Sequence, residues 1–311
     1  MKRNSLDDFR LYVKEHKKRS LVDKRMSEAE AIKRYVSDGD YIAYDFSSLT
    51  RGPQALIREI IRQKKRHLSI CAKFTLAESS LMTGAGCVDK IDVGFLGTIP
   101  YINRAAEAGK VKLEEWTNGS LSFRLTAGAY GMPFIATRAG LGTDTIKYSG
   151  AVVSKDPFTG SNVLLLPPLN PDVGLIHVQE ADIYGNARVY GPTVSALETA
   201  AASKKTIISC ERIVETDEFR KNPSATTIPA FCVDAVVHLP FGAWPGGTQG
   251  YYEVDKEQLS EFAKITDQEK MQKYLSQWVY RFSNHFELLD YLGSKHLSNL
   301  IEQATIIEGY R

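Results

Sequence analysis

Two spacings of apolar residues alternate along the first part of the chain. Residues 41–46 and 68–72 are short apolar runs of the length and β-branched or aromatic character typical of strands. Between them, after Pro53, apolar residues recur every three or four positions, as on one face of a helix: Leu56, Ile57, Ile60 and Ile61. Strand, loop, helix and strand in this order predict a βαβ unit, and therefore parallel strands in a sheet covered on both faces.

The same alternation continues as far as residue 137. The pattern predicts helices over 76–82, 101–108 and 120–130, and strands over 90–95, 111–116 and 132–137. Upstream, Ser27 and Glu30 have the spacing of a capping box at a helix start, and Gly39 ends that helix. The first 20 residues or so are predicted to form a charged helix or arm.

The second half has a more mixed pattern. Strands are predicted over 162–166, 173–179, 205–210 and 231–237, with a turn at 182–187 and a small-residue helix at 195–202. A charged, helical segment begins at Asp255. The expected fold is α/β, with a mostly parallel open sheet flanked by helices, a mixed β second half and a helical C-terminal tail. The expected segments are an N-terminal arm (1–25), a main α/β domain (26–255) and a C-terminal helical extension (256–311).

Composition narrows the class of protein. The 311 residues are 43% hydrophobic and 24% charged, with a formal net charge of +2, so charge favours neither a nucleic acid nor a membrane partner. Basic residues cluster at 14–19 and 64–66, either as solvated helix ends or against the phosphates of a nucleotide-like ligand. No apolar run reaches the ~18–20 residues of a membrane span. No apolar segment follows the basic N-terminus, so no secretory signal is expected.

Several common catalytic motifs are missing. The chain has no P-loop and no G-x-S-x-G elbow, and Gly84-Ala85-Gly86 lacks the third glycine of a dinucleotide fingerprint. Without an H-x-x-x-H or C-x-x-C spacing, neither a metal site nor a disulfide is expected. Three of the four cysteines lie in strand-like apolar runs and are expected to be small buried hydrophobes: Cys71, Cys210 and Cys232. This use of cysteine fits a cytoplasmic protein. His177 and His238 lie in apolar strands, where a buried, hydrogen-bonded histidine is expected rather than a catalytic one.

A loop that follows the first strand is the first candidate site. It offers the hydroxyls of Ser47 and Ser48, the guanidinium of Arg51, and Gly52 before the helix that starts at Pro53. Backbone N–H groups at a helix start and an arginine both favour a carboxylate or phosphate. The structural alternative is that the hydroxyls only cap the helix.

Two further loops also follow predicted strands. The segment 114–120 places Asn118 and Gly119 at the start of a helix, and the segment 137–144 places Arg138 beside Gly140 and Gly142. Glycine turns beside an arginine can direct N–H donors at a developing oxyanion, where each good donor contributes ~3–4 kcal/mol. Glycines in a loop can equally be simple turn formers. Ligands of open α/β sheets bind outside the carboxyl ends of the strands, so three loops at equivalent positions predict one site.

Several segments along the chain have to be considered in combination: 50–61, 86–90 with 93–97, 132–134 with 137–142, 156–160, 170–173 with 177–179, 181–187 and 241–245. Taken together, they resemble the α chains of class I coenzyme A transferases, especially the glutaconate CoA-transferase branch. The resemblance covers roughly residues 25–255.

The resemblance implies a fold shared with sugar-phosphate isomerases and an α2β2 or similar assembly. It implies that coenzyme A moves between an acyl-CoA and a carboxylic acid through a glutamyl-CoA thioester, whose glutamate the β-type subunit supplies. Coenzyme A is then a substrate, and no tightly bound cofactor is expected. No catalytic residue is assigned in this chain; the expected binding residues are Ser47, Ser48, Arg51, Gly52, Asn118, Gly119, Arg138, Gly140 and Gly142.

One departure bears on the type of reaction. A branch of the family that opens rings of CoA esters by hydrolysis carries, by this resemblance, an α-chain carboxylate at the position held here by Asn118. A neutral amide can donate and accept hydrogen bonds but cannot act as a nucleophile or a strong base, which favours the transferase. Glu114 and Glu115 keep the hydrolase as the alternative. A non-catalytic ligand-binding module is the third reading, because a fold does not fix a function.

Overall fold

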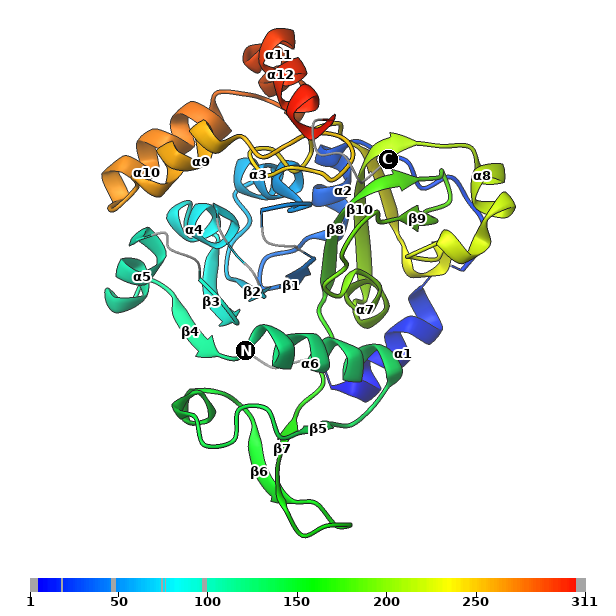
Figure 1. The fold of residues 1–311 in the computed structure, drawn as a ribbon, viewed down its shortest axis with the longest axis vertical. Coiled ribbons are helices and arrows are strands. Elements are labelled where there is room, and N and C mark those ends of the chain that lie inside the picture. The colour runs from blue at the N-terminus through cyan, green and yellow to red at the C-terminus, as the bar shows by residue number, and fades with distance from the viewer. Residues whose placement is uncertain are drawn as a thin grey trace.

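A parallel sheet with helices on both sides forms the body of the molecule (Figure 1). The computed structural model describes residues 5–17, 19–45, 49–73, 75, 77–96 and 100–305. The main sheet has the strand order β11-β10-β8-β1-β2-β3-β4, all parallel, and a short β9 pairs antiparallel with β8. Its strands are β1 (Tyr41–Tyr44), β2 (Leu68–Ala72), β3 (Val88–Val93), β4 (Lys112–Glu115), β8 (Val173–Ala181), β9 (Ala187–Arg188), β10 (Lys205–Ile213) and β11 (Ala235–His238).

The helices follow the strands closely in the first half, which confirms the predicted βαβ alternation. They are α1 (Leu6–His16), α2 (Glu28–Tyr35), α3 (Gln54–Arg62), α4 (Ala77–Gly84), α5 (Pro100–Glu107), α6 (Asn118–Tyr130), α7 (Ala196–Ala202) and α8 (Thr216–Lys221). The predicted capping box forms, because Ser27 accepts from the backbone N–H of Glu30 while the Glu30 carboxylate accepts from that of Ser27. The helical tail is also present, as α9 (Lys256–Ala263), α10 (Gln268–Leu275), α11 (His285–Leu292) and α12 (Ser294–Thr305).

Successive residues of the central strands bury their side chains on opposite faces of the sheet. Leu175 and Ile207 join the core cluster beneath α2, α3 and the tail helices, whereas Ile176 and Ile208 join the cluster beneath α7. All nine residues of β8 are buried, as expected for a strand covered on both faces. The prediction of a mostly parallel sheet flanked by helices is therefore confirmed.

A second, antiparallel sheet projects from the body at the bottom of Figure 1. It consists of β5 (Ile135–Thr137), β6 (Val152–Lys155) and β7 (Asn162–Leu166) in the order β5-β7-β6. The predicted strands 162–166 and 132–137 include all of β7 and all of β5, whereas β6 was not predicted. Large apolar side chains are exposed on and around this small sheet: Tyr130, Met132, Phe134, Tyr148, Val152, Val153 and Phe158.

The two ends of the described chain pack on the body. Arg10 of α1 donates to the carbonyl of Gly131 at the end of α6. In the tail, Met271 of α10 packs directly on Gly84: a Cβ added to Gly84 would fall 2.3 Å from Cγ of Met271. In the part of the chain that the structure describes, no helix has both the length and the apolar character needed to cross a membrane.

Candidate functional site

Arg51, from the first predicted loop, points inward rather than toward solvent. Its side chain is fully buried, and its Nη1 lies 3.1 Å from Oδ2 of Asp45, the residue that follows β1. Its Nη2 donates to the carbonyl of Pro192 at 2.9 Å, and its backbone adopts a φ of 59°. Within the described residues its Nε has no hydrogen-bond partner. Ser47 and Ser48 lie outside the described residues, and Gly52 is buried next to Arg51.

Asp45 is shared by groups from three separate connections at the carboxyl edge of the sheet. Besides Arg51, Nζ of Lys73, which follows β2, lies 3.7 Å from Asp45 Oδ1. The backbone N–H of Ser195, which precedes α7, donates to the same oxygen at 3.1 Å, and Lys73 also donates to the Ser195 hydroxyl. Two cations thus share one carboxylate in a buried place, which leaves a positive field that favours an anion.

Asn118 begins α6 beside this cluster. Thr117 caps the helix through Ser120, and the Asn118 Oδ1 is buried without a hydrogen-bond partner among the described residues. One turn further along α6, the Ser122 hydroxyl lies 3.5 Å from that of Ser195, so α6 approaches the Asp45 cluster. Gly119 is exposed. The second predicted loop therefore lies near the first.

The carboxylates that kept the hydrolase reading open have different surroundings. Glu114 forms an ion pair with Lys90, with 2.6 Å between Oε2 and Nζ, and Lys90 also contacts Asp92 at 2.8 Å. Glu115 is exposed. Glu114 is thus held by a neighbouring strand of the sheet, since β3 carries both Lys90 and Asp92.

The third predicted loop comes from a different sheet. Arg138, which is exposed, follows β5 of the small antiparallel sheet, so the prediction that all three loops leave equivalent strands of one parallel sheet is wrong. Gly140 and Gly142 have φ angles of 96° and 81°, which a glycine adopts most readily. The loop still meets the second one, because Gly140 and Thr143 line a small cavity of about 20 Å³ together with Trp116 and Thr117.

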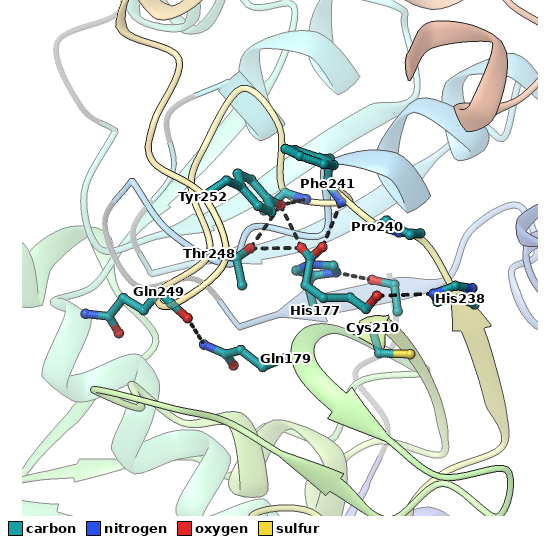
Figure 2. Close-up of polar contacts among 12 residues, drawn as sticks. His177, Gln179, Cys210, His238, Pro240, Phe241, Thr248, Gln249 and Tyr252 are labelled. Carbon is teal, nitrogen blue, oxygen red and sulfur yellow. Dashed lines mark hydrogen bonds and ion pairs between the residues drawn. The ribbon is translucent and has the colours of Figure 1, made fainter. Parts of the chain in front are cut away.

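His177 is buried and hydrogen-bonded, as predicted. Its Nδ1 lies 2.9 Å from the Ser209 hydroxyl and its Nε2 lies 2.6 Å from the Glu211 carboxylate (Figure 2). The same prediction is wrong for the burial of His238, which is exposed at the end of β11, although its Nε2 lies 3.1 Å from the carbonyl of Glu211.

The residues predicted from the sequence do not include Asp45, Lys73, Ser195 or Glu211. Asp45 carried a usable signal, because a carboxylate near the end of a predicted apolar strand lies close to the edge where ligands bind. Lys73 and Ser195 could not be grouped with it from the sequence, since both are far from it along the chain. Glu211 belongs to a separate cluster around His177.

The described part of the chain has neither a cluster of metal ligands nor a reactive cysteine. No group of three or more histidine, cysteine, aspartate or glutamate residues there has the geometry to hold a metal ion. All four cysteines are buried and unbridged, and burial raises the pKa of both Cys71 and Cys87 to about 11. The reactive thiolate form is therefore disfavoured at neutral pH.

Comparisons with known proteins assign the family. The coenzyme A transferase family model matches residues 25–239. The A-type subunit of glutaconate CoA-transferase from Acidaminococcus fermentans is 30% identical over 303 residues, covering 90% of this chain and 95% of that one. The crystal structure of that enzyme superposes with a TM-score of 0.86 at 29% identity, covering 89% of this chain and 95% of that one.

Two further relatives have different reactions in their names. The A-type subunit of 3-oxoadipate CoA-transferase from Pseudomonas knackmussii is 31% identical, covering 90% of this chain and 97% of its own. The cholesterol ring-cleaving hydrolase IpdA subunit of Rhodococcus jostii is 31% identical, covering 82% of this chain and 92% of its own. On this family match and this common fold, the chain belongs to the coenzyme A transferase family as a member of its α type.

Proposed function

We propose that this chain is the α-type subunit of a heteromeric enzyme that moves coenzyme A between an acyl-CoA and a carboxylic acid. The observation that carries the proposal is a similarity over 90% of the chain to the A-type subunits of two such transferases. Coenzyme A is a substrate in this family. A β-type subunit would complete the site, in an α2β2 or similar assembly.

The proposed reaction proceeds through covalent intermediates on a glutamate of the β-type subunit. Its carboxylate attacks the thioester carbonyl and releases CoA thiolate, which leaves an acyl-glutamyl anhydride. The thiolate then attacks the glutamyl carbonyl, which releases the first acid and leaves a glutamyl-CoA thioester. The acceptor acid reverses both steps and leaves as the new acyl-CoA. Together, these steps replace one direct exchange of coenzyme A between two acids with a series of easier acyl transfers.

This chain would supply the binding surface for the acid and the acyl oxygen. The buried cations of Arg51 and Lys73 share Asp45, and Gly52 directly follows Arg51. Their charge, together with the positive end of the α3 dipole, favours an anion near Gly52. Ser47 and Ser48, which lie outside the described residues, would add hydroxyl donors. Asn118 and Gly119 would contact the same ligand from the start of α6.

The exposed third loop would contact the coenzyme. Arg138 has a solvent-accessible guanidinium, which suits a CoA phosphate or a substrate carboxylate. Gly140 and Gly142 adopt positive φ angles, so the loop turns tightly directly after Arg138. The loop therefore takes the more peripheral role.

A reconstitution assay tests the proposal. The chain is combined with a candidate β-type subunit from the same organism, and an acyl-CoA and a carboxylic acid are supplied. Formation of the new acyl-CoA, dependent on both subunits, is the expected result. Release of free acid and CoA without transfer would support a hydrolase, and transfer by this chain alone would contradict the need for a partner.

A CoA-ester hydrolase is the second candidate, favoured by the similarity to the IpdA subunit of the ring-cleaving enzyme. Against it, Asn118 stands where the resemblance places that branch's carboxylate, and Glu114 is held by Lys90. Replacement of Asn118 by Glu is therefore informative. In the reconstituted enzyme, Asn118→Glu should raise the ratio of hydrolysis to transfer if this position selects between the two reactions.

A further inference from the structure

A single carboxylate organises the loop that follows the last strand of the main sheet. Glu211, near the end of β10, has a side chain that is only 3% exposed. The backbone N–H of Phe241 donates to its Oε2 at 2.7 Å. Its Oε1 lies 2.6 Å from His177 Nε2, 3.1 Å from the Thr248 hydroxyl and 2.7 Å from the Tyr252 hydroxyl (Figure 2). Three of these four partners belong to the loop 239–254.

The proton positions follow from the chemistry of the groups. Burial raises the pKa of the Tyr252 phenol well above its usual value, and the nearby Glu211 adds to the shift, so the hydroxyl keeps its proton. An ionised carboxylate only accepts, so Tyr252 donates to Glu211. The Tyr252 oxygen in turn accepts from the backbone N–H of Ala243 at 3.1 Å. Glu211 therefore fixes residues at both ends of the loop.

The loop 239–254 also forms backbone hydrogen bonds with residues 49–51, which belong to the first predicted loop. The N–H of Gly247 donates to the carbonyl of Leu49, and the N–H of Arg51 donates to the carbonyl of Gly247, both at 2.9 Å. Thr50 and Gly247 form an isolated parallel bridge. One further bond, from the N–H of Ala55 to the carbonyl of Gly242 at 2.9 Å, connects the loop to the first turn of α3.

Close packing leaves this arrangement little freedom. A Cβ on Gly246 would fall 2.7 Å from the carbonyl oxygen of Leu49, and one on Gly242 would fall 2.7 Å from Cε1 of His177. A Cβ on Gly247 would fall 2.9 Å from the carbonyl oxygen of Tyr252. Each distance is shorter than a carbon atom tolerates. The backbone of 239–254 therefore touches both the Glu211 cluster and residues 49–51 without intervening space.

We propose that Glu211 is a positioning residue, which holds the loop 239–254 against the sheet and thereby fixes the backbone of Leu49, Thr50 and Arg51. Glu211 acts through Thr248, the neighbour of Gly247, and touches no substrate itself. The functional consequence rests on the proposed transferase site, because it is there that residues 49–52 would face the acid.

Hydrogen–deuterium exchange resolved to single amides tests the tether without any substrate. The Glu211→Gln substitution keeps the size of the side chain but places an NH₂ group among its donors. We expect the amides of Arg51 and Ala55 to exchange at least ten times faster than in the wild type, whereas the amide of Ile57, which bonds to Pro53 within the helix, should keep its rate. Unchanged exchange at Arg51, or equal acceleration at Ile57, would overturn the proposal.

The matched control is Asp182→Asn. Asp182 is also a fully buried carboxylate, and it accepts from the backbone N–H groups of Tyr184 and Asn186 and from the Asn186 side chain. Its contacts lie in the β8–β9 turn, so its replacement should leave the exchange of Arg51 unchanged. If Glu211→Gln does not fold, Thr248→Val removes one contact to Glu211 and should accelerate exchange at Arg51 in the same pattern, to a smaller extent; no acceleration would again overturn the proposal.

Kinetics of the reconstituted enzyme provide the second readout. Glu211→Gln should raise KM for the acid acceptor at least fivefold, with a smaller effect on KM for the acyl-CoA, and Glu211→Asp should recover part of the loss. Equal effects on both substrates would indicate a merely structural role. If the reconstituted wild type transfers no CoA, the proposed function fails, while the exchange experiment still decides whether the tether exists.

Discussion

At the scale of single residues, the candidate site depends on charges that are buried together. Arg51, Lys73 and Asp45 have no exposed side-chain surface, and the distances from Asp45 to the two cations are 3.1 and 3.7 Å. Removing charges from water is costly, and mutual attraction offsets that cost only while every partner stays in place. The loss of one member should therefore affect stability as well as ligand binding.

The first prediction concerns the stability contribution of Arg51. Arg51→Ala should lower the free energy of unfolding by about 3 kcal/mol, because Asp45 then keeps only the more distant Lys73 as a cationic partner. Urea denaturation measures this. The control is Arg220→Ala, which breaks an exposed pair with Asp217 and should cost at most about 1 kcal/mol. If both variants lose the same free energy of unfolding, burial does not strengthen the contribution of the Arg51–Asp45 pair to stability.

The second prediction is a pH effect from His285. Burial lowers the pKa of this histidine to about 3, and the nearby Arg58 guanidinium adds to the shift. The unfolded chain titrates near the usual pKa of about 6.5, so between these values it binds a proton that the folded state does not. The stability contribution is therefore complete above pH 6.5 and decreases as the pH falls, by up to about 1.4 kcal/mol per unit.

Urea denaturation at pH 7 and pH 5 tests whether His285 causes a loss of stability as the pH falls. His285→Gln should reduce the loss of stability between the two pH values, although it also removes the bond from Nε2 to the carbonyl of Pro240 and should lower stability at both. His16→Gln changes an exposed histidine and serves as the control. If His285→Gln keeps the full wild-type pH dependence, the buried histidine does not cause it.

At the scale of elements, close contact between loops and helix starts positions the site. The residue after β3, Gly94, lies against the start of α6, where a Cβ would fall 2.2 Å from Asn118 Oδ1 and 2.8 Å from its backbone nitrogen. No side chain fits between these two elements. The position of Asn118 therefore depends on a glycine from another strand connection.

The third prediction follows from this contact. Gly94→Ala should lower the free energy of unfolding by about 1–3 kcal/mol, because the added methyl group forces the start of α6 to move. Gly119→Ala is the matched control: its Cβ would come no nearer than 3.8 Å to Thr117 Oγ1, and alanine favours the helix by up to about 1 kcal/mol. Thermal melts of both variants decide. A neutral Gly94→Ala would show that the two elements separate easily.

At the scale of the whole molecule, the small antiparallel sheet exposes apolar side chains that nothing in this chain covers among the described residues. It projects from the body (Figure 1), and Val152 and Val153 of its edge strand β6 are 60% and 51% exposed. Adjacent residues of a strand point to opposite faces, so β6 presents apolar groups on both sides. Exposed apolar patches of this kind mark contact surfaces, and the proposed β-type subunit is the expected occupant.

The fourth prediction tests that surface. The double substitution Val152→Glu and Val153→Glu should weaken binding of the β-type subunit by a factor of at least ten, because two charges would be buried at the contact. Analytical ultracentrifugation of the mixed subunits measures it. Ile301→Glu, on the exposed side of α12, is the control and should associate like the wild type. Undiminished association of the double variant would place the partner on another surface.

The order of elements in the first half, and the family, could be predicted from the amino-acid sequence alone. Local periodicity suffices there, because a helix or strand that buries one face must repeat its apolar residues at a fixed spacing. The capping box at Ser27, the buried state of His177 and the parallel sheet followed from such local signals and are confirmed.

The construction of the candidate site became visible only in the folded chain. The cluster joins Asp45, Lys73 and Ser195 across intervals of many residues, and the tether joins Glu211 to Thr248. The sequence favoured an Arg51 side chain directed at ligand, whereas in the structure a buried carboxylate holds it inside. The physical reason is that periodicity states which side of an element is buried, whereas strand order and loop packing determine which residues meet there.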